Sequence, residues 1–132
     1  MGDNLKKLIQ TANAPKPLGP YSQAVETEGF VFVSGQLAVD PKVSKIVAQD
    51  IVGQTRQVLE NIEGILKEAG CGLMDIVQVN VYLANLSLIG EFNAEYSKYF
   101  STQAPARTTV GANLPQGALI EISAIACKTK IV

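Results

Sequence analysis

PARTTVGANLPQGALIEISAIAC, residues 105–127, holds two strand-like segments separated by the turn-forming residues 114–117. Pro and Gly between apolar, alternating runs predict two strands joined by a short turn. On the first strand, alternation places Arg107 and Thr109 on one polar face. On the second strand, Glu121 lies alone among aliphatic residues, opposite a wholly apolar face. These two strands therefore carry both the core pattern and the most unusual charges of the chain.

The pairing of these two strands determines whether Arg107 and Glu121 lie on the same face of the sheet. If they form a hairpin, Glu121 can fall on the same face as Arg107 and Thr109, and the three polar groups would converge in apolar surroundings. An Arg and a Glu on adjacent strands are equally typical of a solvated cross-strand ion pair. A register slip of one residue would turn Glu121 away from Arg107, so the pattern leaves both interpretations open.

The composition is that of one small globular domain covering residues 1–132. The hydrophobic fraction is 47%, and mean hydropathy is +0.18. No apolar run approaches the roughly 20 residues of a membrane span, and the N-terminus lacks a signal-peptide pattern, so we expect a cytoplasmic protein with no membrane partner. The net charge is −1 and lysines are scattered, which argues against a nucleic-acid partner.

The chain has no histidine. Its absence excludes Ser-His-Asp and Cys-His nucleophile activation and the HExxH zinc motif. Cys71 and Cys127 lack CxxC spacing and are most simply small buried side chains. No phosphate-binding glycine motif occurs either. We therefore expect no metal and no cofactor, and any chemistry must come from carboxylates, Arg, Lys, Tyr, hydroxyls and backbone groups.

Local patterns predict two helices among several strands. The first helix runs over 51–69, with Asp50 as its N-cap and Gly70 just beyond its C-terminus. Its apolar stripe leaves Gln54 among the solvated positions. The second helix begins at a Ser87 cap and runs to about residue 100. The remaining strand-like segments are 5–11, 30–37, a short edge segment within 39–48, and 75–83, where Val77, Val79, Val81 and Leu83 share one face.

A proline-rich loop at 14–22 precedes the strongest strand signal, FVFVSGQL at 30–37. Three prolines and a glycine fix this loop in an extended, rigid conformation. Tyr21 is its only aromatic residue, and such a tyrosine either packs over the core edge or is held for binding. Gly35, inside a strand pattern, indicates a bulge or a close backbone approach.

The order of elements predicts an α+β fold with an incompletely covered sheet. Two right-handed strand-helix-strand crossovers built in one direction place both helices on one face of the sheet. Strands such as 30–37 are apolar on both sides, so the second face also needs to be buried. Other copies of the same chain are the economical cover, which would put Arg107 and Glu121 in a cleft between subunits.

The chain contains five collinear motifs: GPYSQAV at 19–25, VFVSGQL at 31–37, QTRQVLENI at 54–62, FNAEY at 92–96, and PARTTVG with LPQGALIEISAIA within 105–126. Together they resemble the Rid family, the reactive intermediate deaminases of the RidA type. The resemblance spans nearly the whole chain. It implies a chorismate-mutase-like α+β fold, a mixed sheet with two helices packed on one face, assembled as a homotrimer with sites between subunits.

The resemblance also implies hydrolysis of 2-aminoacrylate and 2-iminopropanoate to pyruvate and ammonia, which protects pyridoxal-phosphate enzymes. By the same resemblance, Arg107 grips the substrate carboxylate and Glu121 positions the attacking water. Thr109 stands where some members carry cysteine, so a hydroxyl replaces a thiol there. Three further residues match positions that line the pocket: Tyr21, Gly35 and Asn93.

The residue types suit this chemistry. An arginine can take a carboxylate with two parallel N–H bonds, and a glutamate can orient water and accept its proton. A second function stays open, in which the same cleft holds a 2-oxo acid or related metabolite and the trimer regulates protein partners. A ribonuclease activity, assigned to some relatives, fits the acidic, histidine-free chain least.

Overall fold

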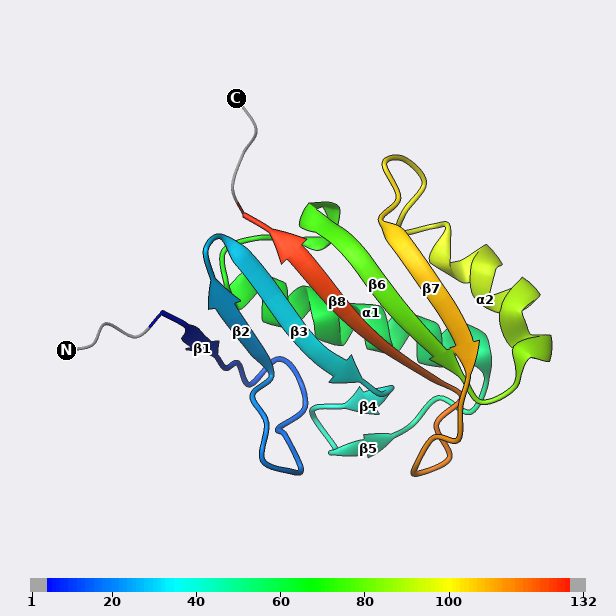
Figure 1. Ribbon diagram of the computed structural model, residues 1–132. Coiled ribbons are helices and arrows are strands. Elements are labelled where there is room, and N and C mark those ends of the chain that lie inside the picture. Colours follow the sequence, from blue (N-terminus) through cyan, green and yellow to red (C-terminus); the bar gives the residue numbers. More distant parts are fainter. Residues whose placement is uncertain (1–4, 129–132) are drawn as a thin grey trace.

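The computed structural model describes residues 5–128 as one mixed sheet backed by two helices (Figure 1). Its helices are α1 (Ile51–Glu68) and α2 (Ile89–Tyr96), with short 3-10 turns at Leu73–Asp75 and Leu86–Leu88. Its strands are β1 (Lys7–Ile9), β2 (Ala24–Thr27), β3 (Phe30–Gln36), β4 (Val39–Asp40), β5 (Lys45–Ile46), β6 (Ile76–Leu83), β7 (Ala106–Gly111) and β8 (Ile120–Cys127). Strand β2 was not predicted, because four residues with a single fully buried side chain leave no clear alternation.

The predicted hairpin between the last two strands is wrong. The six-stranded sheet has the order β1-β2-β3-β8-β6-β7, so β8 lies between β3 and β6 while β7 lies at the edge. β7 pairs only with β6, in parallel, because the β6-α2-β7 crossover returns the chain in the same direction. β8 is antiparallel to both of its neighbours. The segment between β7 and β8 is therefore a connection across one strand and not a hairpin turn.

Helix α1 forms as its end signals predict. The Asp50 side chain accepts a hydrogen bond from the Gly53 amide at 3.1 Å, and Gly70 adopts a φ of 86° beyond the last turn. Gln54, predicted to be solvated, is instead 1% exposed. It lies three residues after Ile51 and four before Val58, and so falls on the buried stripe of the helix.

Two further predictions differ in detail. Ser87 is not a cap: Asn85 caps the 3-10 turn Leu86–Leu88 by accepting from the Ser87 amide at 2.9 Å, and α2 itself begins after Leu88 without a side-chain cap. Val77 is 47% exposed because a bulge shifts the register between Ile76 and Gln78 and puts Ile76 on the buried face instead. The rest of the strand alternates as expected, with Val79, Val81 and Leu83 fully buried.

Both helices lie on one face of the sheet, where α1 packs across β3 and β8 and α2 packs beside it (Figure 1). The core lies between these layers. The opposite face carries Phe30, Phe32 and Val110, each between 41% and 43% exposed in the single chain. This face has no cover within residues 5–128.

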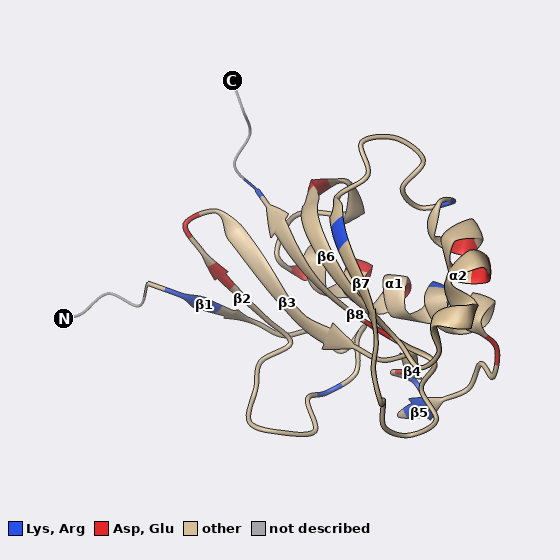
Figure 2. Cartoon of the chain, turned by 45° about the vertical axis from the view of Figure 1, so that its right-hand side comes forward, with Lys and Arg blue, Asp and Glu red and all other residues tan. Residues whose placement is uncertain are grey.

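The charged residues are dispersed, and Figure 2 shows Lys and Arg on β1, β5 and β7, whereas the charged residues of α2 are acidic. No helix formed by residues 5–128 has the length and apolar character needed to cross a bilayer. Cys71 and Cys127, expected to be buried, are only partly so. Burial raises the pKa of the Cys71 thiol, to which the nearby Asp75 carboxylate also contributes.

Candidate functional site

Arg107 lies on the edge strand β7 with its guanidinium over two aromatic rings of α2. The guanidinium carbon is 5.2 Å from the ring centroid of Phe92 and 5.0 Å from that of Tyr96. Phe92 is fully buried and Tyr96 is 6% exposed, so both rings are fixed by the core. Cation–π contact with two fixed rings restrains the guanidinium and leaves its N–H groups available for an anion. Within residues 5–128, Arg107 has no carboxylate partner.

The Tyr96 hydroxyl beneath this arginine stays protonated near neutral pH. Burial raises the pKa of Tyr96, and the positive charge of Arg107 opposes this effect only in part. A third ring, Phe100, lies 4.6 Å from Tyr96 between centroids and continues the stack into the core. The aromatic support therefore offers Arg107 neutral rings and no competing anion.

Thr109 lies on the same face of β7 as Arg107, and Asn93 lies on α2, the helix whose rings contact Arg107. In the parallel pairing with β6, Arg107 aligns with Val79 and Thr109 with Val81, so both project from the helix-side face of β7. Asn93 is an exposed residue of α2, next to Phe92 in the chain. One end of the candidate site is thus a basic group, a hydroxyl and an amide carried by β7 and α2. We call these three residues the arginine half-site.

Glu121 lies on β8 with its carboxylate over the backbone of Gly35. A Cβ atom added to Gly35 would lie 2.9 Å from the carboxyl carbon of Glu121 and closer still to one carboxylate oxygen. Gly35 lies within the bulge in β3 between Val33 and Gln36, as its strand context predicts. Burial raises the pKa of the Glu121 carboxyl, and no Lys or Arg within residues 5–128 forms an ion pair with it.

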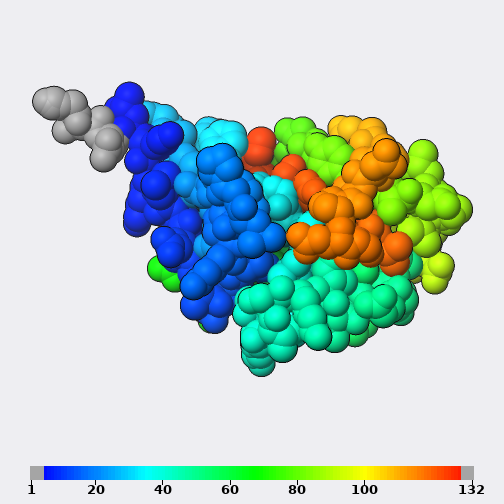
Figure 3. Space-filling view, turned by 90° about the horizontal axis from the view of Figure 1, so that it is seen from below, coloured from blue at the N-terminus to red at the C-terminus, as the bar shows by residue number. Residues whose placement is uncertain are grey.

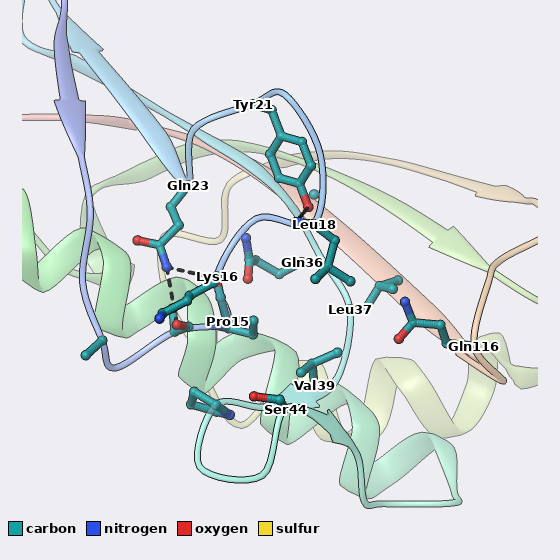
Figure 4. A pocket seen from close by; sticks show the side chains of 14 residues that line it. Pro15, Lys16, Leu18, Tyr21, Gln23, Gln36, Leu37, Val39, Ser44 and Gln116 are labelled. Carbon is teal, nitrogen blue, oxygen red and sulfur yellow. Dashed lines mark hydrogen bonds between the residues drawn. The ribbon is translucent and has the colours of Figure 1, made fainter.

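Tyr21 lies near Gly35, on the proline-rich loop. The two residues line one cavity, which Figure 4 shows from close by. Tyr21 is 52% exposed, and its hydroxyl accepts a long hydrogen bond of 3.4 Å from the Leu18 amide. Its ring also contacts Gly19, with 3.4 Å between a ring carbon and the position of a Gly19 Cβ. Tyr21, Gly35 and Glu121 form the glutamate half-site.

One side chain holds the loop that carries Tyr21. Gln23 is 2% exposed, and its amide nitrogen donates to the carbonyl oxygens of Thr11, Ala14 and Pro15 at 2.9–3.2 Å. Its carbonyl oxygen accepts from the Thr11 amide at 2.7 Å. Gln23 was not predicted from the sequence, although a polar residue at the start of a strand beside a loop without regular structure is a usable signal.

The two half-sites do not meet within one chain. Arg107 aligns through Val79 with Ala124, two strands away from Glu121 in the sheet and three residues along it. Strand spacings of about 4.8 Å and about 3.4 Å per residue put their Cα atoms about 14 Å apart. Glu121 aligns with Tyr82, on the face opposite that of Arg107. The predicted convergence on one hairpin face is therefore wrong, and so is a direct ion pair between them.

Two buried amides of α1, also missed by the sequence analysis, fix segments around the glutamate half-site. Gln54 accepts from the Leu119 amide at 2.8 Å and donates to the Ala48 carbonyl at 3.0 Å. Asn61 donates to the carbonyl oxygens of Leu37 and Val39. Gln54 and Asn61 follow the same three- and four-residue spacing as the apolar residues of α1. This spacing is the sequence signal that predicts their burial.

The family model described as endoribonuclease L-PSP matches residues 11–128. A solved structure of a Rid-family protein of unknown function from Yersinia pestis superposes with a TM-score of 0.89 at 43% identity, covering 92% of this chain and 98% of that one. This chain belongs to the Rid family. The resemblance inferred from the five motifs is therefore confirmed, and so is an α+β architecture with a mixed sheet and two helices.

Rid-family relatives carry several names. A RutC family protein of Pyrococcus horikoshii is 50% identical over 125 residues, which is 94% of this chain and 99% of that one. The 2-iminobutanoate/2-iminopropanoate deaminase of the mouse is 39% identical over 127 residues, which is 96% of this chain and 94% of that one. Membership thus includes imine deaminases and does not by itself choose the activity of this Rid protein.

Proposed function

We propose that this Rid protein hydrolyses reactive 2-imino acids and their enamine tautomers, such as 2-iminopropanoate and 2-aminoacrylate, to 2-oxo acids and ammonia. The observation that carries this proposal is the Glu121 carboxylate. It is partly buried, lies against the space left by Gly35, and has no cation partner within residues 5–128. A carboxylate in that setting is suited to accept a proton from water.

The arginine half-site supplies the complementary group. A 2-imino acid is anionic at its carboxylate, and the Arg107 guanidinium can bind that carboxylate with two parallel N–H bonds. Thr109 and Asn93 offer further hydrogen-bonding groups beside it. Since Arg107 already rests on Phe92 and Tyr96, little ordering of its side chain is needed when substrate binds.

The complete site forms between copies of the chain, which we propose to be a homotrimer. Arg107 and Glu121 project from opposite faces of the sheet, so a substrate between them needs the arginine half-site of one copy and the glutamate half-site of the next. The exposed apolar face around Phe30, Phe32 and Val110 gives the copies a reason to associate.

Hydrolysis in such a cleft needs only these groups. Water held by Glu121 adds through its oxygen to the imine carbon as Glu121 accepts a water proton, and nitrogen takes up the C=N π electrons and that proton, which gives a carbinolamine. Glu121 then accepts the hydroxyl proton as the C=O bond forms and the C–N bond breaks, and nitrogen receives this proton as it leaves as ammonia. One water and one imino acid thus give one 2-oxo acid and one ammonia, and Arg107 binds the substrate carboxylate throughout.

The first test is a coupled assay. An amino-acid oxidase with catalase generates 2-iminopropanoate, and semicarbazide traps what remains. We expect faster imine loss with the wild type, and a large rise in KM for Arg107→Lys because an ammonium cannot reproduce the guanidinium fork. Arg56→Lys is the matched control, since Arg56 pairs with Glu95 between the helices and belongs to neither half-site. Near-normal KM in Arg107→Lys would refute the carboxylate role.

A second test concerns the shared site. Arg107→Ala and Glu121→Gln chains, each nearly inactive, are unfolded together and refolded as a mixture. If each site takes one half from each of two copies, random assembly restores about a quarter of the wild-type activity. No recovery from a well-folded mixed assembly would refute the shared site. No acceleration by the wild type itself would favour the metabolite-binding function over the enzyme.

A further inference from the structure

A cavity of about 480 Å³ lies beside the glutamate half-site. Its walls are the proline-rich loop, the end of β3 with the residues after it, and the β4–β5 hairpin. Figure 3 shows the loop and the hairpin side by side on the face seen from below. The lining residues are Ala12, Ala14, Pro15, Lys16, Leu18, Tyr21, Gln23, Gly35, Gln36, Leu37, Val39, Pro41, Ser44 and Gln116 (Figure 4).

The cavity shares two lining residues, Tyr21 and Gly35, with the glutamate half-site. Gly35 lines it and also lies under the Glu121 carboxylate, and Tyr21 lines it from the loop. A substrate carbon attacked by water at Glu121 would therefore sit at the mouth of the cavity. Such a carbon carries three groups: the carboxylate, the nitrogen and the side chain. Because the carboxylate is bound from the arginine half-site, the side chain is the group left to enter.

The walls of the cavity are held in place from behind. Gln23 binds the backbone of the loop at Thr11, Ala14 and Pro15, and Asn61 binds the carbonyl oxygens of Leu37 and Val39 at 3.2 and 2.9 Å. Both amides are at most 2% exposed. Buried hydrogen bonds of this kind rigidify the segments they join, so the cavity is a preformed space.

The chemistry of the lining selects an uncharged occupant. Lys16 is the only charged residue among the lining residues, and it is exposed to solvent. Leu18, Leu37 and Val39 present aliphatic surface, while the amide of Gln36, 5% exposed, supplies the buried polar group. A charged side chain would lose its water here without finding a partner. The volume lies in the range of about 300–1,000 Å³ usual for small-molecule pockets, far more than one methyl group needs.

We propose that this cavity receives the side chain of the 2-imino acid, and that Val39 and Leu18 limit its size. The inference rests on the proposed deaminase function and specifies its substrates. The preferred substrates carry an uncharged side chain of the size of leucine or methionine. The smallest imino acid, 2-iminopropanoate, fills the site near Glu121 and leaves the cavity empty.

The test compares imines made from leucine and from alanine by an amino-acid oxidase. In the wild type, kcat/KM for the leucine-derived imine is expected to exceed that for 2-iminopropanoate. In Val39→Phe, which fills the cavity, the ratio of the two kcat/KM values is expected to fall at least about tenfold, as for the loss of a hydrophobic subsite. Leu18→Trp is a second variant that narrows the mouth, and Leu18 is 80% exposed, so its replacement does not threaten folding.

Val47→Phe is the matched control, because Val47 follows the same hairpin, is 55% exposed and does not line the cavity. An unchanged ratio in both cavity variants, with the wild type active, would overturn the side-chain assignment and leave the deaminase standing. So would equal losses on both substrates. A wild type that hydrolyses neither imine would overturn the proposed function and this inference together.

Discussion

Replacing Tyr96 with leucine removes one of the two rings under the Arg107 guanidinium while keeping an apolar side chain in the core. If the two rings position Arg107, Tyr96→Leu is expected to lower the affinity for anionic ligands and to leave kcat unchanged. Arg107 itself is untouched, so its charge and hydrogen-bonding groups are retained. The variant therefore tests the contribution of the Tyr96 ring separately from that of the Arg107 guanidinium.

The magnitude follows from the geometry. The guanidinium carbon is 5.0 Å from the Tyr96 centroid, inside the roughly 6 Å within which a cation–π contact is effective. Arg107 is exposed in the single chain, so the value for exposed sites applies, about 0.5–1 kcal/mol per ring. This free energy corresponds to binding weaker by about two- to fivefold. Truncating a buried aromatic residue also lowers stability, by about 1–3 kcal/mol.

Calorimetry with 2-oxobutanoate measures the affinity, and the coupled imine assay separates KM from kcat. We expect both the dissociation constant and KM of Tyr96→Leu to rise by this factor, with kcat within twofold of wild type. Tyr96→Phe keeps the ring and should restore the wild-type dissociation constant. Phe100→Leu is the control for core damage, because Phe100 is 5% exposed and contacts the Tyr96 ring at 4.6 Å between centroids.

Two results would contradict the reasoning. One is an unchanged dissociation constant in Tyr96→Leu, which would mean that the strand alone positions Arg107. The other is an equal loss of affinity in Phe100→Leu, which would trace the effect to general loosening of the core and not to the ring beneath the cation.

Gly35→Ala forces a Cβ against the Glu121 carboxylate, and such overpacking is expected to cost about 1–3 kcal/mol in a denaturant titration and to lower kcat; wild-type kcat would show that Glu121 moves freely. Burial raises the folded-state pKa of Glu121, so its stabilising contribution is present below the unfolded pKa and is lost as pH rises through the folded one. Glu121→Gln should therefore melt higher than wild type at pH 7, with the gap closing toward pH 4, while kcat falls about 10²–10⁴-fold; a lower melting temperature at pH 7 would contradict this. Gln54→Leu leaves the Leu119 amide without its acceptor and is expected to lower the free energy of unfolding by about 1–3 kcal/mol, measured as a lower urea midpoint. An unchanged midpoint would show that water replaces the lost hydrogen bond.

Features encoded by neighbouring residues could be predicted from the sequence. Helix α1 follows from its Asp50 cap, its apolar spacing and Gly70, all within about 20 residues of one another. The buried face of β8 follows from strict alternation between Ile120 and Ala126. The residues of both half-sites were named through the resemblance to the Rid family, and their joint role stays a prediction.

Features that depend on distant pairing could not be predicted in this way. Turn-forming residues at 114–117 favour a local hairpin, but β8 instead inserts between β3 and β6, where both of its edges are paired. Residues 105–111 contain no signal for this choice, because pairing partners are set by the whole sheet. The bulge at Val77 likewise depends on the contact of β6 with β8. The periodicity of apolar residues alone also places Gln54 on the solvated face of α1. Its burial depends on its hydrogen bonds to backbone groups of two separate loops.

Gln23 holds the proline-rich loop through main-chain atoms only, at Thr11, Ala14 and Pro15. Every residue type has a carbonyl oxygen, so substitutions at exposed loop positions such as Lys16 and Leu18 leave these acceptors in place. Substitutions can therefore change the surface of this loop while its backbone conformation is retained. If the substrates available to the protein change, substitutions are therefore expected to accumulate first at the exposed positions of this loop. Gln23 makes this possible, because it holds the loop backbone independently of those side chains.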